Sequence, residues 1–170
     1  MYESEFWRII DATRKAAQGD PVDHAERLVE RLAELSPEEV VDFARLFELR
    51  LTRSYTWGLW AAAAVLLGEA DEDDFEAFRC WLIGQGRAVY EGAVDDPDSL
   101  ADLLRRFDED IDGDAEELGW AADEAYDRLT GDELPELGIP EPERPEGPPL
   151  DLRDPQALAN RVPRVWERFC

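Results

Sequence analysis

Lysine, histidine and cysteine are nearly absent from this chain. Its 170 residues include one lysine (Lys15), one histidine (His24) and two cysteines (Cys80 and Cys170). A lone histidine cannot build a zinc site without further histidine or cysteine ligands, and the two cysteines provide no disulfide framework. Because unpaired cysteines are typical of a reducing compartment, we expect a cytoplasmic protein.

Long hydrophobic runs are also missing. No apolar run approaches the length of about 18 residues that a membrane-spanning helix needs. The N-terminus lacks the basic and then apolar pattern of a secretory signal. These two absences predict a protein that is not inserted in a membrane.

Positive charge is scarce relative to negative charge. The chain has 18 Lys and Arg residues against 42 Asp and Glu residues, for a net charge of -24. Nucleic acids and anionic membrane surfaces attract proteins through Lys and Arg, so the charge balance argues against direct binding to either. A basic partner protein, or one that normally binds DNA, fits this charge.

What the sequence does contain is helical periodicity. Hydrophobic residues recur with a period of about 3.6 along nearly the whole chain, and no segment alternates as a strand would. The almost purely apolar segment from Trp57 to Gly68 belongs at the centre of the core. We therefore predict an all-α fold, a compact multi-helix bundle with helices over residues 3–18, 21–35, 36–55, 57–68, 74–93, 95–107 and 113–131.

Two of these helices need comment. The helix over residues 74–93 is continuous unless Gly84 and Gly86 interrupt it, since glycine weakens a helix interior. In the helix over residues 21–35, His24 stands in an acidic first turn, and we predict a surface residue there. We assign the apolar stripe of that helix to Val22, Ala25, Leu28, Val29, Leu32 and Leu35.

The composition changes after Gly131. Seven of the eleven prolines lie between Pro135 and Pro155, so this segment cannot be helical and predicts an extended arm that wraps the surface. Apolar residues then return at helical spacing, among them Trp166 and Phe169. We therefore divide the chain into a helical domain (residues 1–130), a Pro-rich acidic arm (131–155) and a C-terminal helical tail (156–170) that docks on the domain.

One acidic loop partly matches a metal-binding pattern. Asp108, Asp110 and Asp112 fall at the first three ligand positions of an EF-hand loop, but Gly119 stands where that loop needs a bidentate carboxylate. We interpret the segment as a solvated loop that precedes a helix, with calcium or magnesium binding as the weaker alternative. The acidic turn at residues 70–74 could also hold a hard cation, but we interpret it as a helix start, because acidic side chains there are stabilised by the helix dipole. We predict no cofactor.

The segment from Asp73 to Arg87, DDFEAFRCWLIGQGR, concentrates aromatic and cationic residues. Arg79 lies one turn after Phe75, so its stem should be partly buried and its charged head should need a carboxylate. The available partners are Asp73, Glu76 and Glu48. In the first interpretation, Arg79 forms an ion pair that holds this helix to its neighbours.

The second interpretation of this segment is functional. Arg79, Gln85 and Arg87 would line a groove beside the rings of Trp57, Trp60 and Trp81. Cationic groups held on rigid helices in an acidic protein are suited to binding a carboxylate or a phosphate. These residues, together with Asp73, are therefore the candidate site for a ligand or partner.

The same region resembles a known family. The runs FWRIID near the start and YTWGLWAAAAVLLGEADEDDFEAFRCWLIGQGRAVYEGAVDDPDSLADL resemble DUF4240, a bacterial domain family of unknown function, over roughly residues 1–130. The chain departs from the family pattern at the turn, where Ala70, Asp71, Glu72 and Asp74 replace Cys, Ser, Asp and Gly. The resemblance implies no activity. The matching residues are Trp57, Trp60, Asp73, Phe75, Phe78, Arg79, Trp81, Leu82, Ile83 and Gly86.

Three functions are compatible with these observations. The first is a non-catalytic interaction or adaptor protein that binds a protein or peptide through a groove rimmed by Trp and Arg. The second is a small-molecule binder or enzyme that uses Asp73, Arg79, Gln85 and Arg87, although no nucleophile motif is present. The third is an acidic mimic of DNA. The first is our main prediction.

Overall fold

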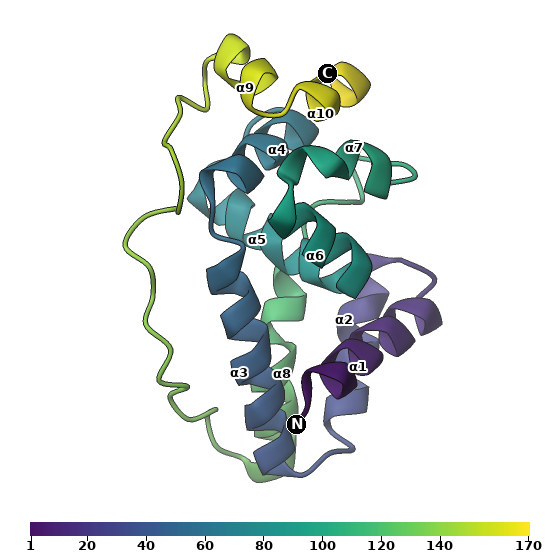
Figure 1. Cartoon of the computed structure of the whole chain (residues 1–170). Helices are drawn as coiled ribbons and strands as arrows, with labels where there is room; N and C mark the ends of the chain where they lie inside the picture. Colours follow the sequence, from purple (N-terminus) through teal and green to yellow (C-terminus); the bar gives the residue numbers. More distant parts are fainter.

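The computed structural model describes residues 1–170 and is all-α, as predicted (Figure 1). It has ten α-helices, one short 3-10 helix (Pro97–Ser99) and no strand. No helix combines the length and the apolar character needed to cross a bilayer. The α-helices are α1 (Glu3–Ala16), α2 (Pro21–Leu32), α3 (Pro37–Arg53), α4 (Trp57–Leu67), α5 (Glu72–Gly84), α6 (Arg87–Asp95), α7 (Leu100–Leu103), α8 (Glu116–Thr130), α9 (Pro155–Arg161) and α10 (Pro163–Phe169).

The helices form two connected groups. The long helices α3 and α8 lie side by side, with α1 and α2 packed against them (Figure 1). At the other end of the molecule, α4 and α5 carry α6, α7 and the two C-terminal helices. Helix α5 belongs to both groups, since it contacts α1, α3 and α8 as well as α4 and α6.

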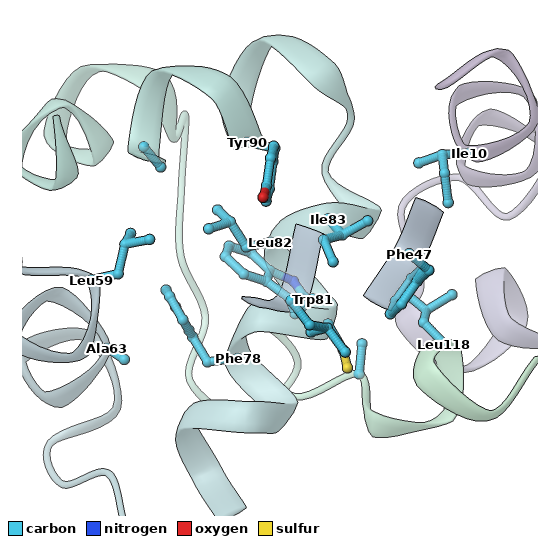
Figure 2. Packing of buried hydrophobic residues seen from close by; sticks show 14 of the residues in the cluster. Ile10, Phe47, Leu59, Ala63, Phe78, Trp81, Leu82, Ile83, Tyr90 and Leu118 are labelled. Atoms are coloured by element: carbon cyan, nitrogen blue, oxygen red, sulfur yellow. The ribbon is translucent and has the colours of Figure 1, made fainter. Parts of the chain in front are cut away.

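The apolar helix α4 and the C-terminal half of α5 form the centre of the core. Every residue from Leu59 to Leu66 is buried, as predicted for a helix that is apolar all round. Figure 2 shows the α5 side chains Phe78, Trp81 and Leu82 between labelled residues of α4 on one side and of α1, α3 and α8 on the other. Any functional surface of α5 is therefore confined to its N-terminal half, where Glu72, Asp73, Asp74 and Glu76 are exposed.

The predicted helix over residues 74–93 is two helices, because Gly86 interrupts it. Gly86 has a φ of 98° and a ψ of 171°, a conformation that is strongly disfavoured for residues with a side chain. The bend directs α6 across the end of α3, where the Tyr90 hydroxyl donates a hydrogen bond to the Arg50 carbonyl (2.7 Å). This break places Arg87 at the start of α6 and not on α5, the helix that carries Arg79.

The prediction that His24 is a surface residue is wrong. The side chain is buried, with 3 % of its surface exposed, and its Nε2 lies 2.9 Å from Thr13 Oγ1. Val22, which we assigned to the core, is instead 63 % exposed. The inner face of α2 starts at Pro21 and continues through His24, Ala25, Leu28, Val29 and Leu32. Helical spacing from Pro21 places position 24 on the buried face of α2, and the hydrogen bond with Thr13 gives the buried imidazole a polar partner.

The Pro-rich segment runs along one side of the molecule, from the end of α8 to α9 (Figure 1). It is fixed at Glu146, which forms an isolated parallel bridge with Thr56. Its amide donates to the Tyr55 carbonyl and its carbonyl accepts from the Trp57 amide, both at 3.0 Å. Beyond it, α9 and α10 pack on α4. The segment therefore forms part of the walls beside α3 and α5.

Candidate functional site

Arg79 is held by a carbonyl group and by aromatic rings, and the predicted ion pair is wrong. The residue is 7 % exposed, and its Nη1 donates to the Leu51 carbonyl at the end of α3 (2.7 Å). Its guanidinium carbon lies 4.7 Å from the ring centre of Tyr55 and 4.8 Å from that of Phe75. No carboxylate lies within 4.0 Å of it. Aromatic faces and a helix-end carbonyl replace the expected carboxylate.

The tryptophans predicted to rim the groove lie mainly in the core. Trp57 stacks on Trp60 (5.4 Å between ring centres), and Trp60 stacks on Phe75 (4.8 Å). Trp60 also donates a hydrogen bond from Nε1 to the Ala70 carbonyl (2.9 Å), which fixes the turn before α5. Trp81 is 2 % exposed. Only Trp57 retains partial exposure, so the three rings cannot form an open rim.

The remaining candidates lie on a different face from Arg79. Gln85 accepts a hydrogen bond from Arg14 of α1 (3.4 Å), and Arg87 pairs with Glu3 at 3.7 Å. Asp73 is exposed in the first turn of α5. The predicted common groove for Arg79, Gln85 and Arg87 is therefore wrong, because Gln85 and Arg87 line one hollow and Arg79 lines another.

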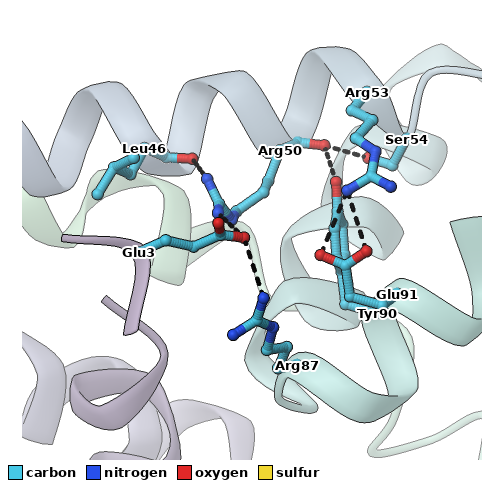
Figure 3. Close-up of polar contacts among 8 residues, drawn as sticks. All are labelled: Glu3, Leu46, Arg50, Arg53, Ser54, Arg87, Tyr90 and Glu91. Carbon is cyan, nitrogen blue, oxygen red and sulfur yellow. Dashed lines mark hydrogen bonds and ion pairs between the residues drawn. The ribbon is translucent and has the colours of Figure 1, made fainter. Parts of the chain in front are cut away.

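Arg87 belongs to a charged network that joins three helices (Figure 3). Glu3 of α1 pairs with Arg50 of α3 at 2.8 Å and also faces Arg87. Arg50 is buried, donates to the Leu46 carbonyl (2.9 Å) and lies over the ring of Phe6 (4.7 Å). Because Glu3 pairs with arginines of two other helices, the network fixes α1 and α6 against α3, although Arg50 Nε is buried without a partner.

Sequence reasoning missed an acidic groove. It is a hollow of about 590 Å³ between α3, α5 and α8, closed on one side by residues 134–141 of the arm. Its walls carry six carboxylates and no basic side chain. Its lining residues are Glu48, Leu51, Glu76, Cys80, Glu116, Gly119, Trp120, Asp123, Leu134, Pro135, Glu136, Leu137, Gly138, Ile139 and Glu141.

Two carboxylates of the acidic groove, Glu48 and Asp123, are partly desolvated. Burial raises the pKa of Glu48, and the nearby carboxylates of Glu76 and Glu141 raise it further. Burial likewise raises the pKa of Asp123. Like charges that lose water and face one another gain from a cation placed between them. The groove is therefore electrostatically suited to a positively charged ligand.

Trp120 is the exposed aromatic residue beside this groove. Its side chain is 61 % exposed, although it projects from a helix whose opposite face is buried. It also borders a second hollow of about 430 Å³ between α2 and α8, which has four carboxylates and one basic residue. A large ring thus stands between two acidic hollows. The acidic residues and Trp120 on the outer face of α8 were the sequence signal for this surface.

A smaller pocket adjoins the acidic groove and contains Arg79. It has a volume of about 270 Å³ and shares Glu48, Leu51, Glu76 and Glu141 with the groove. Tyr55 forms part of its wall, and burial together with the Glu72 carboxylate raises the pKa of this hydroxyl to about 12. We call this hollow the Arg79 pocket. It places one buried cation among several acidic side chains.

The other reactive residues have structural surroundings. Burial raises the pKa of the Cys80 thiol to about 12, so the thiolate nucleophile does not form near neutral pH. Asp108 and Asp112 accept hydrogen bonds from the backbone amides of Asp110 and Asp108. No group of three or more His, Cys, Asp or Glu side chains converges in a way that could hold a metal ion.

Comparison with known proteins identifies the family. A family model described as a protein of unknown function, DUF4240, matches residues 1–128, which is the part from α1 to the last turn of α8. No curated protein matches the chain, and no solved structure matches it. The match includes the α3, α5 and α8 walls of the acidic groove but not the arm. The chain belongs to the DUF4240 family.

Proposed function

We propose that this protein is a non-catalytic interaction domain that binds a basic segment of a partner protein in the acidic groove, against Trp120. The observation that carries the proposal is the position of Trp120. An indole ring that is 61 % exposed stands between two hollows whose charged lining residues are ten carboxylates and one arginine. We expect it to act in the cytoplasm, where Cys80 and Cys170 stay reduced.

The chemistry of this surface favours Arg and Lys side chains. A guanidinium group can stack on an exposed indole and still reach carboxylates on either side of it. Exposed tryptophan is also among the residues that supply most of the energy at protein interfaces. The net charge of -24 adds long-range attraction, which accelerates the encounter with a basic partner.

The alternative functions receive less support. Enzymatic use of Asp73, Arg79, Gln85 and Arg87 would require them in one site, but Arg79 lines a different hollow from Gln85 and Arg87, and Asp73 is exposed at the start of α5. A DNA mimic would also bind a basic partner, and it differs from our proposal in one respect. Its partner should lose DNA when it binds this protein, whereas a basic segment outside a DNA-binding surface should not.

The proposal is tested by binding of a basic probe. A short peptide of alternating arginine and leucine, labelled for fluorescence anisotropy, should bind the wild-type protein. Trp120→Ala should weaken this binding by about tenfold or more, the size of effect typical of an interface tryptophan. Because the side chain is exposed, the substitution should leave the melting temperature nearly unchanged.

Tyr2→Ala provides the matched control. Tyr2 is also an exposed aromatic residue, 83 % exposed, and it borders neither acidic hollow. Its removal should not change the affinity for the probe. Equal affinities of the wild-type protein and Trp120→Ala, or equal losses in both variants, would contradict the proposal.

A further inference from the structure

Arg79 has hydrogen-bond donors that no residue of the chain uses. Its guanidinium donates one hydrogen bond, from Nη1 to the Leu51 carbonyl, and its Nε is buried without a partner. Arginine carries five N–H donors, so most of those of Arg79 are unmatched. The residue is 7 % exposed and lines the Arg79 pocket. The donors that remain free are available to an acceptor from outside the chain.

The surroundings of Arg79 restrict what that acceptor can be. Glu48, Glu72, Glu76 and Glu141 line the same pocket, so an anion without a positive charge of its own would be repelled. A cation alone would satisfy the glutamates and leave Arg79 without an acceptor. The pocket therefore suits a ligand that carries a carboxylate and a positive charge close together.

We infer that the Arg79 pocket binds the C-terminal carboxylate of the basic peptide segment that the acidic groove accepts. This inference rests on the proposed function, because it treats the pocket and the groove as one continuous site. The two hollows share Glu48, Leu51, Glu76 and Glu141, so a chain end seated at Arg79 continues directly into the groove. The partner segment is thus a basic C-terminus.

Each part of such a peptide meets a group that it complements. The terminal carboxylate accepts hydrogen bonds from Arg79, beside the ring of Tyr55. The basic side chains just before it lie against Glu48 and Glu76, at the junction of the two hollows. Residues farther from the chain end reach Trp120. The volume of about 270 Å³ accommodates the terminal residue and little more, which favours a chain end over an internal segment.

The test compares two forms of one peptide on the unaltered protein. The acetylated arginine and leucine probe is prepared with a free C-terminal carboxylate and with a C-terminal amide, and both are titrated by calorimetry. The free acid should bind about tenfold more tightly or better, because only the carboxylate offers charge-assisted acceptors to Arg79. Trp120→Ala should weaken both forms by the same factor.

Variants assign this preference to Arg79. Arg79→Gln should bind the two forms with equal affinity, and Arg45→Gln, which alters an exposed arginine of α3, should keep the preference for the acid. If the acid and the amide bind the wild-type protein equally, or the amide binds more tightly, the inference fails and the proposed function stands. If neither form binds, both fail. Even if Arg79→Gln does not fold, the affinities of the wild-type protein for the acid and the amide test whether the pocket binds a C-terminal carboxylate.

Discussion

Burial lowers the pKa of His24 to about 4, because a charged imidazolium between α1 and α2 would lose its hydration. The hydrogen bonds of the ring fix its neutral form. The single hydroxyl proton of Thr13 is donated to the Ile9 carbonyl (2.8 Å), so the His24 Nε2–H must donate to Thr13 Oγ1 (2.9 Å). On the other side, the ring packs near Gly84, where a Cβ would lie 3.5 Å from Nδ1 in ordinary contact and 2.6 Å from Leu118 Cδ1.

This environment makes the stability of the protein depend on pH through one residue. The unfolded chain binds a proton at His24 with a pKa of about 6.5, and the folded protein does so only near pH 4. The unfolded state therefore binds more protons in this window, and stability decreases as the pH falls through it. Between pH 7.5 and pH 5, the wild-type protein should lose about 2 kcal/mol of unfolding free energy relative to His24→Gln.

Denaturant unfolding of both proteins at several pH values measures that difference. Burial raises the pKa of Glu48 and Asp123, and these carboxylates stabilise the folded protein as the pH falls. Their contribution is common to both proteins and cancels in the comparison. Glutamine can keep a donor toward Thr13 without a titrating ring. Parallel curves for the two proteins would mean that His24 is accessible to water.

His24 and Arg79 show what single residues reveal in advance and what they conceal. The spacing from Pro21 through Ala25 to Leu32 assigns position 24 to the buried face, but a polar residue type obscured it. Burial of the Arg79 stem was predicted correctly from its place beside Phe75 and Phe78. Its partners could not be predicted, because Leu51 and Tyr55 come from a different helix and from the turn after it.

At the scale of elements, Gly86 sets the direction of α6. A Cβ at this position would lie 2.6 Å from Asp11 Oδ1, and its backbone conformation is strained for every residue with a side chain. Both effects act in the folded state alone. Gly86→Ala should therefore destabilise the protein by about 3 kcal/mol or more, measured by chemical denaturation.

Gly131→Ala is the reference substitution, at a left-handed glycine without a clash. Gly131 ends α8 with a φ of 74°, and a Cβ there would meet no atom within 4 Å. Its substitution should cost about 1 kcal/mol, the strain of a left-handed conformation without a clash. A loss at Gly86 no greater than that at Gly131 would show that the backbone at Gly86 relaxes and that Asp11 moves aside.

Most helices could be predicted from the sequence, but which face of each helix is buried could be predicted less well. The helix start at Ser36 is a capping box that can be seen in the sequence, and the apolar α4 could be placed correctly because it has no polar face. Helix α5 starts at Glu72, two residues before the predicted start, because Asp71 and Asp74 form a second capping box. The exposed face of α8 was harder to interpret, since Trp120 suggests a buried position. Its exposure depends on where α2 and α3 pack, which local periodicity does not determine.

At the scale of the whole molecule, the candidate site is assembled from distant parts of the chain. The acidic groove combines Glu48 of α3, Glu76 of α5, Asp123 of α8 and Glu141 of the arm. Composition predicted an acidic protein and a Pro-rich arm. It could not predict that three helices and the arm bring their carboxylates together. That arrangement follows from the packing of α3, α5 and α8 around a shared core.

The surplus of negative charge should also make salt act in opposite directions on folding and on binding. With 42 acidic and 18 basic residues, the folded chain repels itself more than the expanded chain does. Raising the ionic strength from about 10 mM to about 150 mM shortens the Debye length from about 30 Å to about 8 Å.

The screened protein should be more stable by about 1 kcal/mol, which is a rise of about 2–4 °C in melting temperature for a chain of this size. The same change should weaken binding of the arginine and leucine probe several-fold, since that attraction is screened as well. Thermal melts and anisotropy titrations across one salt series measure both. A melting temperature that falls with salt would mean that ion pairs such as Glu3 with Arg50 outweigh the general repulsion. If the affinity for the probe does not change with salt, the leucines of the probe provide the binding energy, through contacts with apolar lining residues such as Leu51 and Leu137. The carboxylates of the groove would then contribute little.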